Sequence, residues 1–260
     1  TASLGEALAT DYFLVREQLS AEQWENFIRT RRFVDHEVLP AINGYWERAE
    51  LPWPLITRLG ELGLVGEDIE GYGCPGMSPL ACGLVNMELH RGDGSLGTFL
   101  GVHSGLAMKS IAMLGSEEHK QHWLAPMARL ERIGAFALTE PDHGSDAVAL
   151  ETRARRDGDA YVIDGVKRWI GNATIADVVV VWARSDEDGQ VTAFVVETGT
   201  PGYDASVITG KGAARAVWQA DVRLDDPNGP VVGNTPYQSD GLPAGSHRVY
   251  LSAVGYRFAV

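Results

Sequence analysis

The stretch FALTEPDHGSD, residues 136–146, gives the first indication of how this chain folds. It continues a short apolar run, residues 133–138, that is typical of a strand, and it turns at Thr139 into a loop carrying Gly144 and Ser145. Such a loop offers backbone N–H groups and hydroxyls to a ligand, and a glycine lets the main chain approach that ligand closely. These groups suit phosphate oxygens or the edge of a heterocycle.

A second segment, GVKRWIGNA at residues 165–173, complements the first. Trp169 is followed by Ile170 and Gly171 at the end of another predicted strand, so a flat apolar side chain stands beside exposed backbone. A plain β-turn explains the first segment equally well when that segment is considered alone. The presence of both segments at this separation favours a pocket for a flavin.

Several separated motifs, in this order, resemble one family. LTEPxxGSD followed by KxWIxNA is similar to the acyl-CoA dehydrogenases, and EGYGCPG, GSEEHKQHWLAPMARLE and VVVVWAR most resemble the glutaryl-CoA dehydrogenase branch. The resemblance covers residues 20–226. It implies FAD as the cofactor, an acyl-CoA substrate and an electron acceptor such as an electron-transfer flavoprotein. It also implies a homo-oligomer, which is a tetramer in the family, and a role in fatty acid or amino acid catabolism.

The resemblance implies roles for individual residues. Those expected to line or flank the flavin ring, or to meet the diphosphate, are Phe136, Leu138, Thr139, Gly144, Ser145, Trp169, Ile170 and Gly171. Ser145 is also expected to contact the substrate, together with Gly97 and Thr98. One position departs from the family: where Thr commonly follows Trp-Ile, this chain has Gly171, so a hydroxyl near flavin N5 is missing.

The acyl group is not expected to be glutarate. In glutaryl-specific relatives an acidic residue and an arginine read the distal carboxylate, and the arginine pairs with it. Aligning MELHRGDGSLGT with that segment puts His90 at the acidic position and Gly97 at the arginine position. Because this carboxylate clamp is absent, a neutral acyl chain or a different acid-reading group is preferred.

The chemistry that the resemblance implies is α,β-desaturation of an acyl thioester. A carboxylate removes the α-proton while the β-hydride passes to flavin N5. In the family this base is a glutamate on a helix of the C-terminal bundle, and no residue here matches it, so no catalytic residue is assigned. Two alternatives stay open: a non-catalytic acyl-CoA- or flavin-binding fragment or subunit, and a flavin oxidase or monooxygenase on the same scaffold.

The hydrophobic pattern changes once along the chain. Residues 1–132 are expected to form a helical domain, whose first helix starts at a Ser20 capping box and ends at Pro40. Ser78 and Ser116 are expected to cap later helices, and residues 71–76 are expected to form a loop. Residues 133–226 hold short β-rich runs with Asp-Gly pairs at 157–158, 164–165 and 188–189, which predict tight antiparallel turns. The expected class is α+β: an all-helical N-terminal domain, then an antiparallel β-barrel or sandwich, without the family's C-terminal helical bundle. Residues 227–260 are predicted to be an irregular tail that does not match the family.

Composition excludes several other classes. The net charge of −13 argues against nucleic acid as a partner. The apolar runs are far shorter than the ~20 residues of a membrane span, and no leader opens the chain, so a cytoplasmic location is expected. The two cysteines, Cys74 and Cys82, lack a disulfide or metal spacing, and the histidines form no metal-binding motif.

Other polar residues near the motifs are predicted to be structural. His143 is expected to be a solvated loop histidine, and Glu140 and Asp146 are expected to stabilise the loop. Lys211 and Arg215 suit CoA phosphates and surface salt bridges equally, so they are left out of the predicted site.

Overall fold

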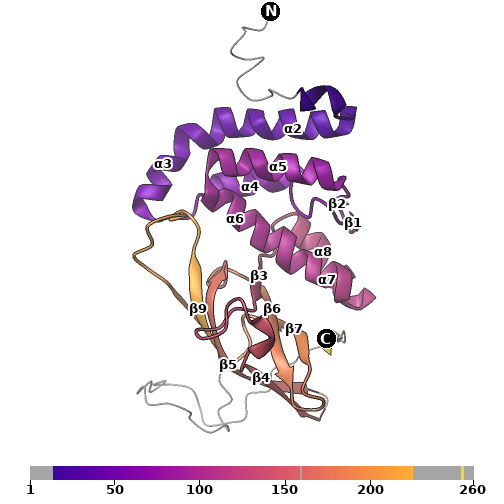
Figure 1. Ribbon diagram of the computed structural model, residues 1–260, viewed down its shortest axis with the longest axis vertical. Coiled ribbons are helices and arrows are strands. Elements are labelled where there is room, and N and C mark those ends of the chain that lie inside the picture. Colours follow the sequence, from indigo (N-terminus) through magenta and orange to yellow (C-terminus); the bar gives the residue numbers. More distant parts are fainter. Residues whose placement is uncertain (1–13, 159, 225–252, 255–260) are drawn as a thin grey trace, which may run out of the picture.

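Helices fill the first half of the chain and a curled sheet fills the second (Figure 1). The computed structural model describes residues 14–158, 160–224 and 253–254. The predicted α+β class is therefore confirmed. The helical segments, of which η2 and η3 are π-helical, are η1 (Val15–Gln18), α2 (Ala21–Phe33), η2 (Val34–Val38), α3 (Leu39–Arg48), α4 (Trp53–Glu61), α5 (Pro79–Gly92), α6 (Gly94–Leu100), η3 (Gly101–Met108), α7 (Lys109–Leu114) and α8 (Glu117–Ala128).

Serine hydroxyls start α2, α5 and α8. Ser20 accepts a hydrogen bond from the N–H of Gln23, whose side chain accepts one from the Ser20 N–H, and this is the predicted capping box. Ser78 and Ser116 accept from backbone N–H groups at the starts of α5 and α8, also as predicted. These caps define the helix starts because they satisfy N–H groups that have no partner inside the helix.

The sequence predicted that the first long helix ends at Pro40, and this prediction is wrong. The helix continues through η2 and α3 to Arg48, and the chain then turns through Ala49 with a φ of 54°. Pro40 lies at the start of α3, directly after the π-helical turn of η2. Proline is tolerated where a helical turn begins anew, because the N–H that it lacks has little to bind there.

The sheet is mixed rather than wholly antiparallel. Its strands run in the order β10-β7-β6-β4-β5-β9-β8, and β3 lies beside β6. The pairs β3–β6 and β4–β6 are parallel, because the chain forms β4 and β5 before it returns to run alongside β3. The strands are β3 (Gly134–Ala137), β4 (Arg153–Asp157), β5 (Ala160–Gly171), β6 (Val178–Ser185), β7 (Val191–Glu197), β8 (Tyr203–Val207), β9 (Gln219–Leu224) and β10 (Ala253–Val254).

Two other segments differ from the expected pattern. The predicted loop at residues 71–76 contains a minimal hairpin of β1 (Glu70–Gly71) and β2 (Cys74–Pro75). Strand β8 has no counterpart in the sequence prediction. The predicted tail, residues 227–260, lies outside the described residues apart from β10, whose backbone pairs with β7. Within the described part of the chain, no helix is both long and apolar enough to cross a membrane.

Two of the three predicted Asp-Gly turns are confirmed. Gly158 and Gly189 adopt φ values of 63° and 72° between β4 and β5 and between β6 and β7. The turn predicted at Asp164-Gly165 is wrong, because both residues lie inside β5. A Cβ on Gly165 would lie 2.3 Å from Thr152 Oγ1, so the glycine permits close contact between two segments instead of a turn.

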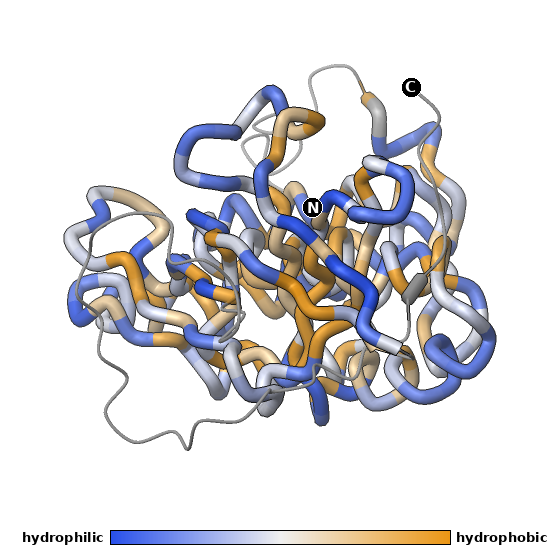
Figure 2. The backbone as a smooth tube through the Cα atoms, turned by 90° about the horizontal axis from the view of Figure 1, so that it is seen from below, coloured by the Kyte–Doolittle hydropathy of each residue, from blue (hydrophilic) through white to orange (hydrophobic). Residues whose placement is uncertain are grey.

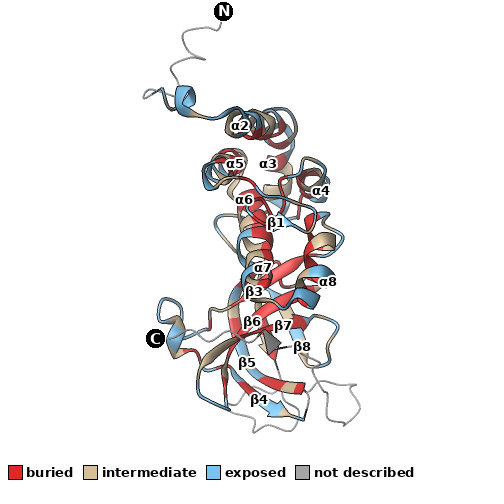
Figure 3. Ribbon diagram, turned by 90° about the vertical axis from the view of Figure 1, so that its right-hand side faces the viewer, coloured by how far each residue is buried: buried red, intermediate tan, exposed pale blue. Residues whose placement is uncertain are grey.

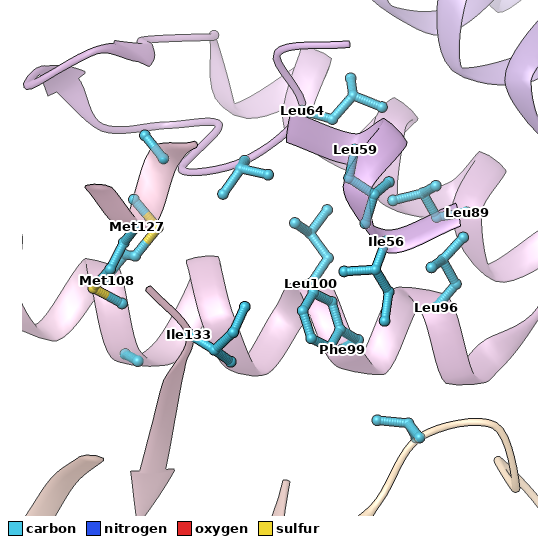
Figure 4. Packing of buried hydrophobic residues seen from close by; sticks show 14 of the residues in the cluster. Ile56, Leu59, Leu64, Leu89, Leu96, Phe99, Leu100, Met108, Met127 and Ile133 are labelled. Carbon is cyan, nitrogen blue, oxygen red and sulfur yellow. The ribbon is translucent and has the colours of Figure 1, made fainter. Parts of the chain in front are cut away.

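One apolar core runs from the helices into the sheet. Buried side chains of α4, α5, α6 and η3, including Ile56, Leu89 and Phe99, pack together and continue through Met127 to Ile133 (Figure 4). The buried residues lie on the inner faces of the helices and in the middle of the sheet (Figure 3). A second cluster fills the curl of the sheet, where apolar segments gather inside a border of hydrophilic turns (Figure 2).

His103 links the helices to the first strand of the sheet. Its imidazole is fully buried on η3, where Nδ1 accepts from the Gly134 N–H at 2.9 Å and Nε2 lies 3.1 Å from the Met127 carbonyl. Because a carbonyl can only accept, Nε2 carries the proton and the ring is neutral. Burial lowers the pKa of His103 to about 4, and the bond to Met127 only partly opposes this shift.

We expect His103 to make the fold acid-sensitive. The unfolded chain binds a proton at this residue below an ordinary pKa of about 6.5, whereas the folded chain does so only near 4, so stability falls as the pH drops through that window. Between pH 7 and pH 5 the native chain should lose about 2 kcal/mol more unfolding free energy than a His103→Gln variant. Urea unfolding at both pH values measures this, and equal losses in the two chains would contradict it.

Candidate functional site

The two predicted segments lie side by side, where β3 and the loop after it meet β5. The Arg168 N–H donates to the Thr139 carbonyl at 2.8 Å, and the Lys167 ammonium donates to the Leu138 carbonyl at 3.1 Å. At the far end of the same contact, the Asn172 amide lies 3.5 Å from the Gly134 carbonyl. β3 and the first residues after it therefore run alongside the second half of β5, and the two segments form one structural unit.

Trp169 projects outward from a β-bulge in that unit. The register of β5 against β9 shifts between Lys167 and Ile170, and Trp169 adopts a φ of 63° with 52% of its surface exposed. The Arg168 guanidinium lies 5.5 Å from the centre of the indole ring. A bulky residue in the left-handed region costs energy, and such positions cluster at binding sites. The bulge thus presents an exposed aromatic face on the surface of the sheet.

The loop after β3 is open to solvent. Gly144 and Ser145 are exposed, and a Cβ placed on Gly144 would meet no atom within 4 Å. His143 is half-buried, with Nε2 3.5 Å from the Glu151 carboxylate. The loop therefore has free space beside its backbone, as a ligand would require.

Glu140 holds this loop from the inside. Its carboxylate is 5% exposed and accepts from the Glu151 N–H at 2.6 Å, the Thr152 N–H at 2.9 Å and the Thr152 hydroxyl at 2.5 Å. It also receives the Lys167 ammonium at 2.8 Å. Burial on its own raises the pKa of Glu140, but these donors together outweigh burial and keep the pKa below its usual range. Glu140 is therefore an ionised, fully bonded group, which fits a structural role.

The remaining predicted flavin residues occupy two different environments. Phe136, Leu138 and Thr139 are half-buried, and the Phe136 ring meets Trp182 edge-on at 5.9 Å. Ile170 and Gly171 are buried, so the structure does not bring them to the exposed surface that Trp169 forms.

Gly171 packs against the helical half. A Cβ at this position would lie 2.8 Å from Val102 Cγ2 on η3, closer than real Cβ atoms approach a neighbour. Asn172, next in the chain, is fully buried and donates to the Phe99 carbonyl at 3.2 Å. The end of β5 thus packs against the consecutive helical segments α6 and η3.

The predicted substrate residues on α6 are largely covered. Gly97 is buried, and a Cβ on it would lie 2.4 Å from the His90 imidazole. His90 lies on α5, where its Nδ1 is 2.9 Å from the Asn86 carbonyl, so this nitrogen donates. Thr98 is half-buried. The His90 ring therefore occupies the space that a larger side chain at position 97 would need.

Sequence reasoning missed Lys167, Thr152 and Val102. Lys167 is 0% exposed, and a lysine is rarely buried unless it has a partner such as Glu140. The sequence did contain a signal for Lys167: it is a lysine within a predicted strand, two residues before Trp169, and the other motif contains an oppositely charged residue, Glu140. Thr152 and Val102 carried no comparable signal, because their roles depend on contacts between distant segments.

Other features lie away from this unit. A groove of about 580 Å³ is lined by side chains of α2 and α4, including Trp24, Arg29 and Arg58, and by none of the predicted site residues. Among the residues that the structure describes, no group of three or more His, Cys, Asp or Glu side chains could hold a metal ion. The place where β3, the loop after it and β5 meet is therefore the candidate functional site.

A helical half followed by a curled sheet, with these motifs at their junction, is the architecture of the acyl-CoA dehydrogenase fold. The model of the acyl-CoA dehydrogenase N-terminal domain matches residues 20–131, and that of the middle domain matches residues 135–227. Together the two models cover most of the chain. The chain belongs to the acyl-CoA dehydrogenase family, which confirms the resemblance seen in the sequence.

Three relatives illustrate the similarity. The bovine (Bos taurus) mitochondrial short-chain specific acyl-CoA dehydrogenase is 36% identical over 75% of this chain and 48% of its own length. A glutaryl-CoA dehydrogenase from Mycobacterium smegmatis, solved with FADH2, is 40% identical with a TM-score of 0.80, over 82% of this chain and 55% of that chain. A chain from the electron transferring flavoprotein structure of Acidaminococcus fermentans is 33% identical with a TM-score of 0.75, over 80% and 56%. This chain spans about half the length of the curated relatives it matches.

We expect Gly171 and Val102 to be energetically coupled. A Gly171→Thr substitution introduces the family's common residue but overpacks the contact with Val102, and it should destabilise the chain by about 1–3 kcal/mol. A Val102→Ala substitution removes the obstructing methyl groups. The double variant should therefore be more stable than the sum of the single effects predicts. Urea unfolding of the native chain, the two single variants and the double variant gives the coupling energy. If the two single changes in unfolding free energy simply add, the contact between positions 171 and 102 is not the cause of the destabilisation.

Proposed function

We propose that this chain is the FAD- and acyl-CoA-binding part of an acyl-CoA dehydrogenase, which forms an α,β double bond in an acyl-CoA thioester. The observation that carries the proposal is the hydrogen bonding of the first motif segment to β5 at Lys167 and Arg168, beside the exposed Trp169, while the loop at Gly144 is open to solvent. Membership of the family supports it, as does the FADH2 bound to the Mycobacterium smegmatis relative.

The residues where β3 and β5 meet suit FAD. Trp169 offers an exposed aromatic face, and the half-buried Phe136, Leu138 and Thr139 lie along the strand that contacts its segment. We assign these four residues to the isoalloxazine ring. The open backbone near Gly144 is suited to phosphate oxygens, because N–H groups in a turn attract anions.

The other assignments follow from exposure and burial. Gly144 and Ser145 are proposed to bind the FAD diphosphate or the thioester, since both are exposed beside free space. Ile170 and Gly171 act from beneath the site as buried backbone that supports Trp169. Bound FAD would accept the β-hydride, while these residues orient the reactants and exclude water.

No residue is assigned as the base that removes the α-proton. Glu140 is a carboxylate within the first motif, but it is buried and its oxygens accept from four donors. A general base must reach the substrate proton directly or through one water. Glu140 therefore stays a structural residue in this proposal.

We propose a neutral acyl chain rather than glutarate. Gly97 carries no charge, and the His90 ring covers it while its Nδ1 is engaged by the Asn86 carbonyl. The proposed electron acceptor is an electron-transfer flavoprotein, which the similarity to the Acidaminococcus fermentans chain supports. A homo-oligomer and a cytoplasmic location stay predictions from the sequence.

FAD binding tests the cofactor assignment. The chain mixed with excess FAD should bind it, and at about 100 times the dissociation constant the ligand should stabilise the fold by about 2.7 kcal/mol. A Trp169→Gly variant should bind FAD much more weakly and still fold, because the ring is half-exposed and glycine adopts a positive φ without strain. A Trp123→Ala variant is the control: it removes a buried aromatic of α8, lowers stability by about 3–5 kcal/mol and should leave the FAD dissociation constant unchanged.

The absence of flavin absorbance and of any thermal shift in the native chain would refute the cofactor assignment. Equal dissociation constants for the native chain and the Trp169→Gly variant would instead remove Trp169 from the site.

Anaerobic addition of butyryl-CoA to the FAD-loaded chain tests the reaction. We expect a change in the flavin spectrum on binding and little or no bleaching, because a missing base typically lowers the rate by about 10² to 10⁴. Glutaryl-CoA should perturb the spectrum less than butyryl-CoA. Rapid bleaching would reveal a base among the residues now called structural, and rapid oxygen uptake in air would favour the oxidase alternative.

A further inference from the structure

The Lys167 ammonium is buried at the point where β5 begins its bulge. It is 0% exposed and donates to the Leu138 carbonyl at 3.1 Å and to Glu140 Oε1 at 2.8 Å. Both acceptors belong to the segment that leaves β3. A single side chain thus links the bulged strand to the loop on its other side.

Glu140 extends this link to the far end of the loop. The same carboxylate that receives Lys167 also accepts the N–H groups of Glu151 and Thr152, eleven and twelve residues later in the chain. Both ends of the segment that carries Gly144 and Ser145 are therefore held by one buried group. Holding both ends of this segment requires a charged group, because an ionised carboxylate accepts all of these hydrogen bonds and a neutral amide cannot.

Close packing limits any adjustment of this arrangement. Thr152, which gives Glu140 both its N–H and its hydroxyl, lies so close to β5 that a Cβ on Gly165 would be 2.3 Å from its hydroxyl oxygen. The loop end and the strand are thus in direct contact two residues before Lys167. A shift of the loop would have to move β5 as well.

We propose that the buried Glu140–Lys167 pair is a positioning device for the FAD site, which holds the loop carrying Gly144 and Ser145 in register with Trp169. This inference rests on the proposed function. Neither member of the pair is exposed, so neither touches the cofactor, and both act through the backbone that they hold. A site built on a loop needs such a support if its groups are to stay in the binding geometry.

A second buried carboxylate provides a matched control. Glu88 on α5 is 0% exposed and accepts from Arg31 and Arg91, joining α2 to α5. Replacing either glutamate by glutamine leaves a cation without its full counter-charge in the protein. A loss of stability alone would therefore be common to both variants, whereas a loss of FAD affinity would separate them.

The test compares FAD dissociation constants of the native chain, Glu140→Gln and Glu88→Gln, at a temperature where all three are folded. We expect Glu140→Gln to weaken FAD binding at least about tenfold, which corresponds to 1.4 kcal/mol, and Glu88→Gln to leave it unchanged. Dissociation constants that are equal in all three chains would overturn the proposal.

Two further measurements keep the test decisive. If Glu140→Gln does not fold, Thr152→Val removes the hydroxyl bond alone, keeps both charges and should still weaken FAD binding by a few-fold, on the order of the loss of one such bond. Hydrogen exchange requires no ligand: Glu140→Gln should raise exchange in residues 140–152 and 165–172 selectively, and Glu88→Gln should not. A uniform rise in both variants would overturn the positioning role. Failure of the native chain to bind FAD, with this selective exchange intact, would instead refute the proposed function.

Discussion

The burial of one positive charge governs the motif-bearing half of this protein. A lysine ammonium removed from water is stable only with a counter-charge and hydrogen-bond acceptors at close range. For Lys167 these are Glu140 and the Leu138 carbonyl, so the end of β3, the loop and β5 must meet where they do. The LTEP and KRW stretches are therefore two parts of one buried ion pair. Each loses its electrostatic partner if the other is absent.

A second set of polar contacts determines how the helices meet the sheet. The His103 ring bridges Gly134 and Met127, and the Asn172 amide donates to the Phe99 carbonyl. On the other side, the Ser95 hydroxyl accepts from the Ala216 N–H, and the Trp218 indole donates to the Ala49 carbonyl. Apolar packing alone would tolerate sliding between two such surfaces. Buried hydrogen bonds do not, since every displaced donor would lose its partner in a medium without water.

Local signals predicted the parts of this structure that depend on local chemistry. Serine caps located the starts of three helices, and two Asp-Gly pairs located turns, because the energy of each feature comes from residues within a few positions. Pro40 and Gly165 were misjudged for the opposite reason. A π-helical turn precedes Pro40, and Thr152 presses on Gly165, so distant or unusual context reversed the ordinary meaning of each residue. The motif residues were recognisable, but the burial of Gly97 and Gly171 depends on side chains of the helices, and that of Ile170 on the apolar cluster of the sheet.

The bulge in β5 explains why neighbouring motif residues have such different surroundings. Trp169 and Asn172 both adopt φ values of 63°, and the strand between them is buried. Asparagine tolerates this conformation, whereas tryptophan does so at a cost. That cost persists only if contacts on both sides over-determine the backbone. Lys167 provides them on one side, and Asn172, wedged against α6, provides them on the other. Between these two anchors the chain has no room to relax Trp169 inward, and the indole stays at the surface.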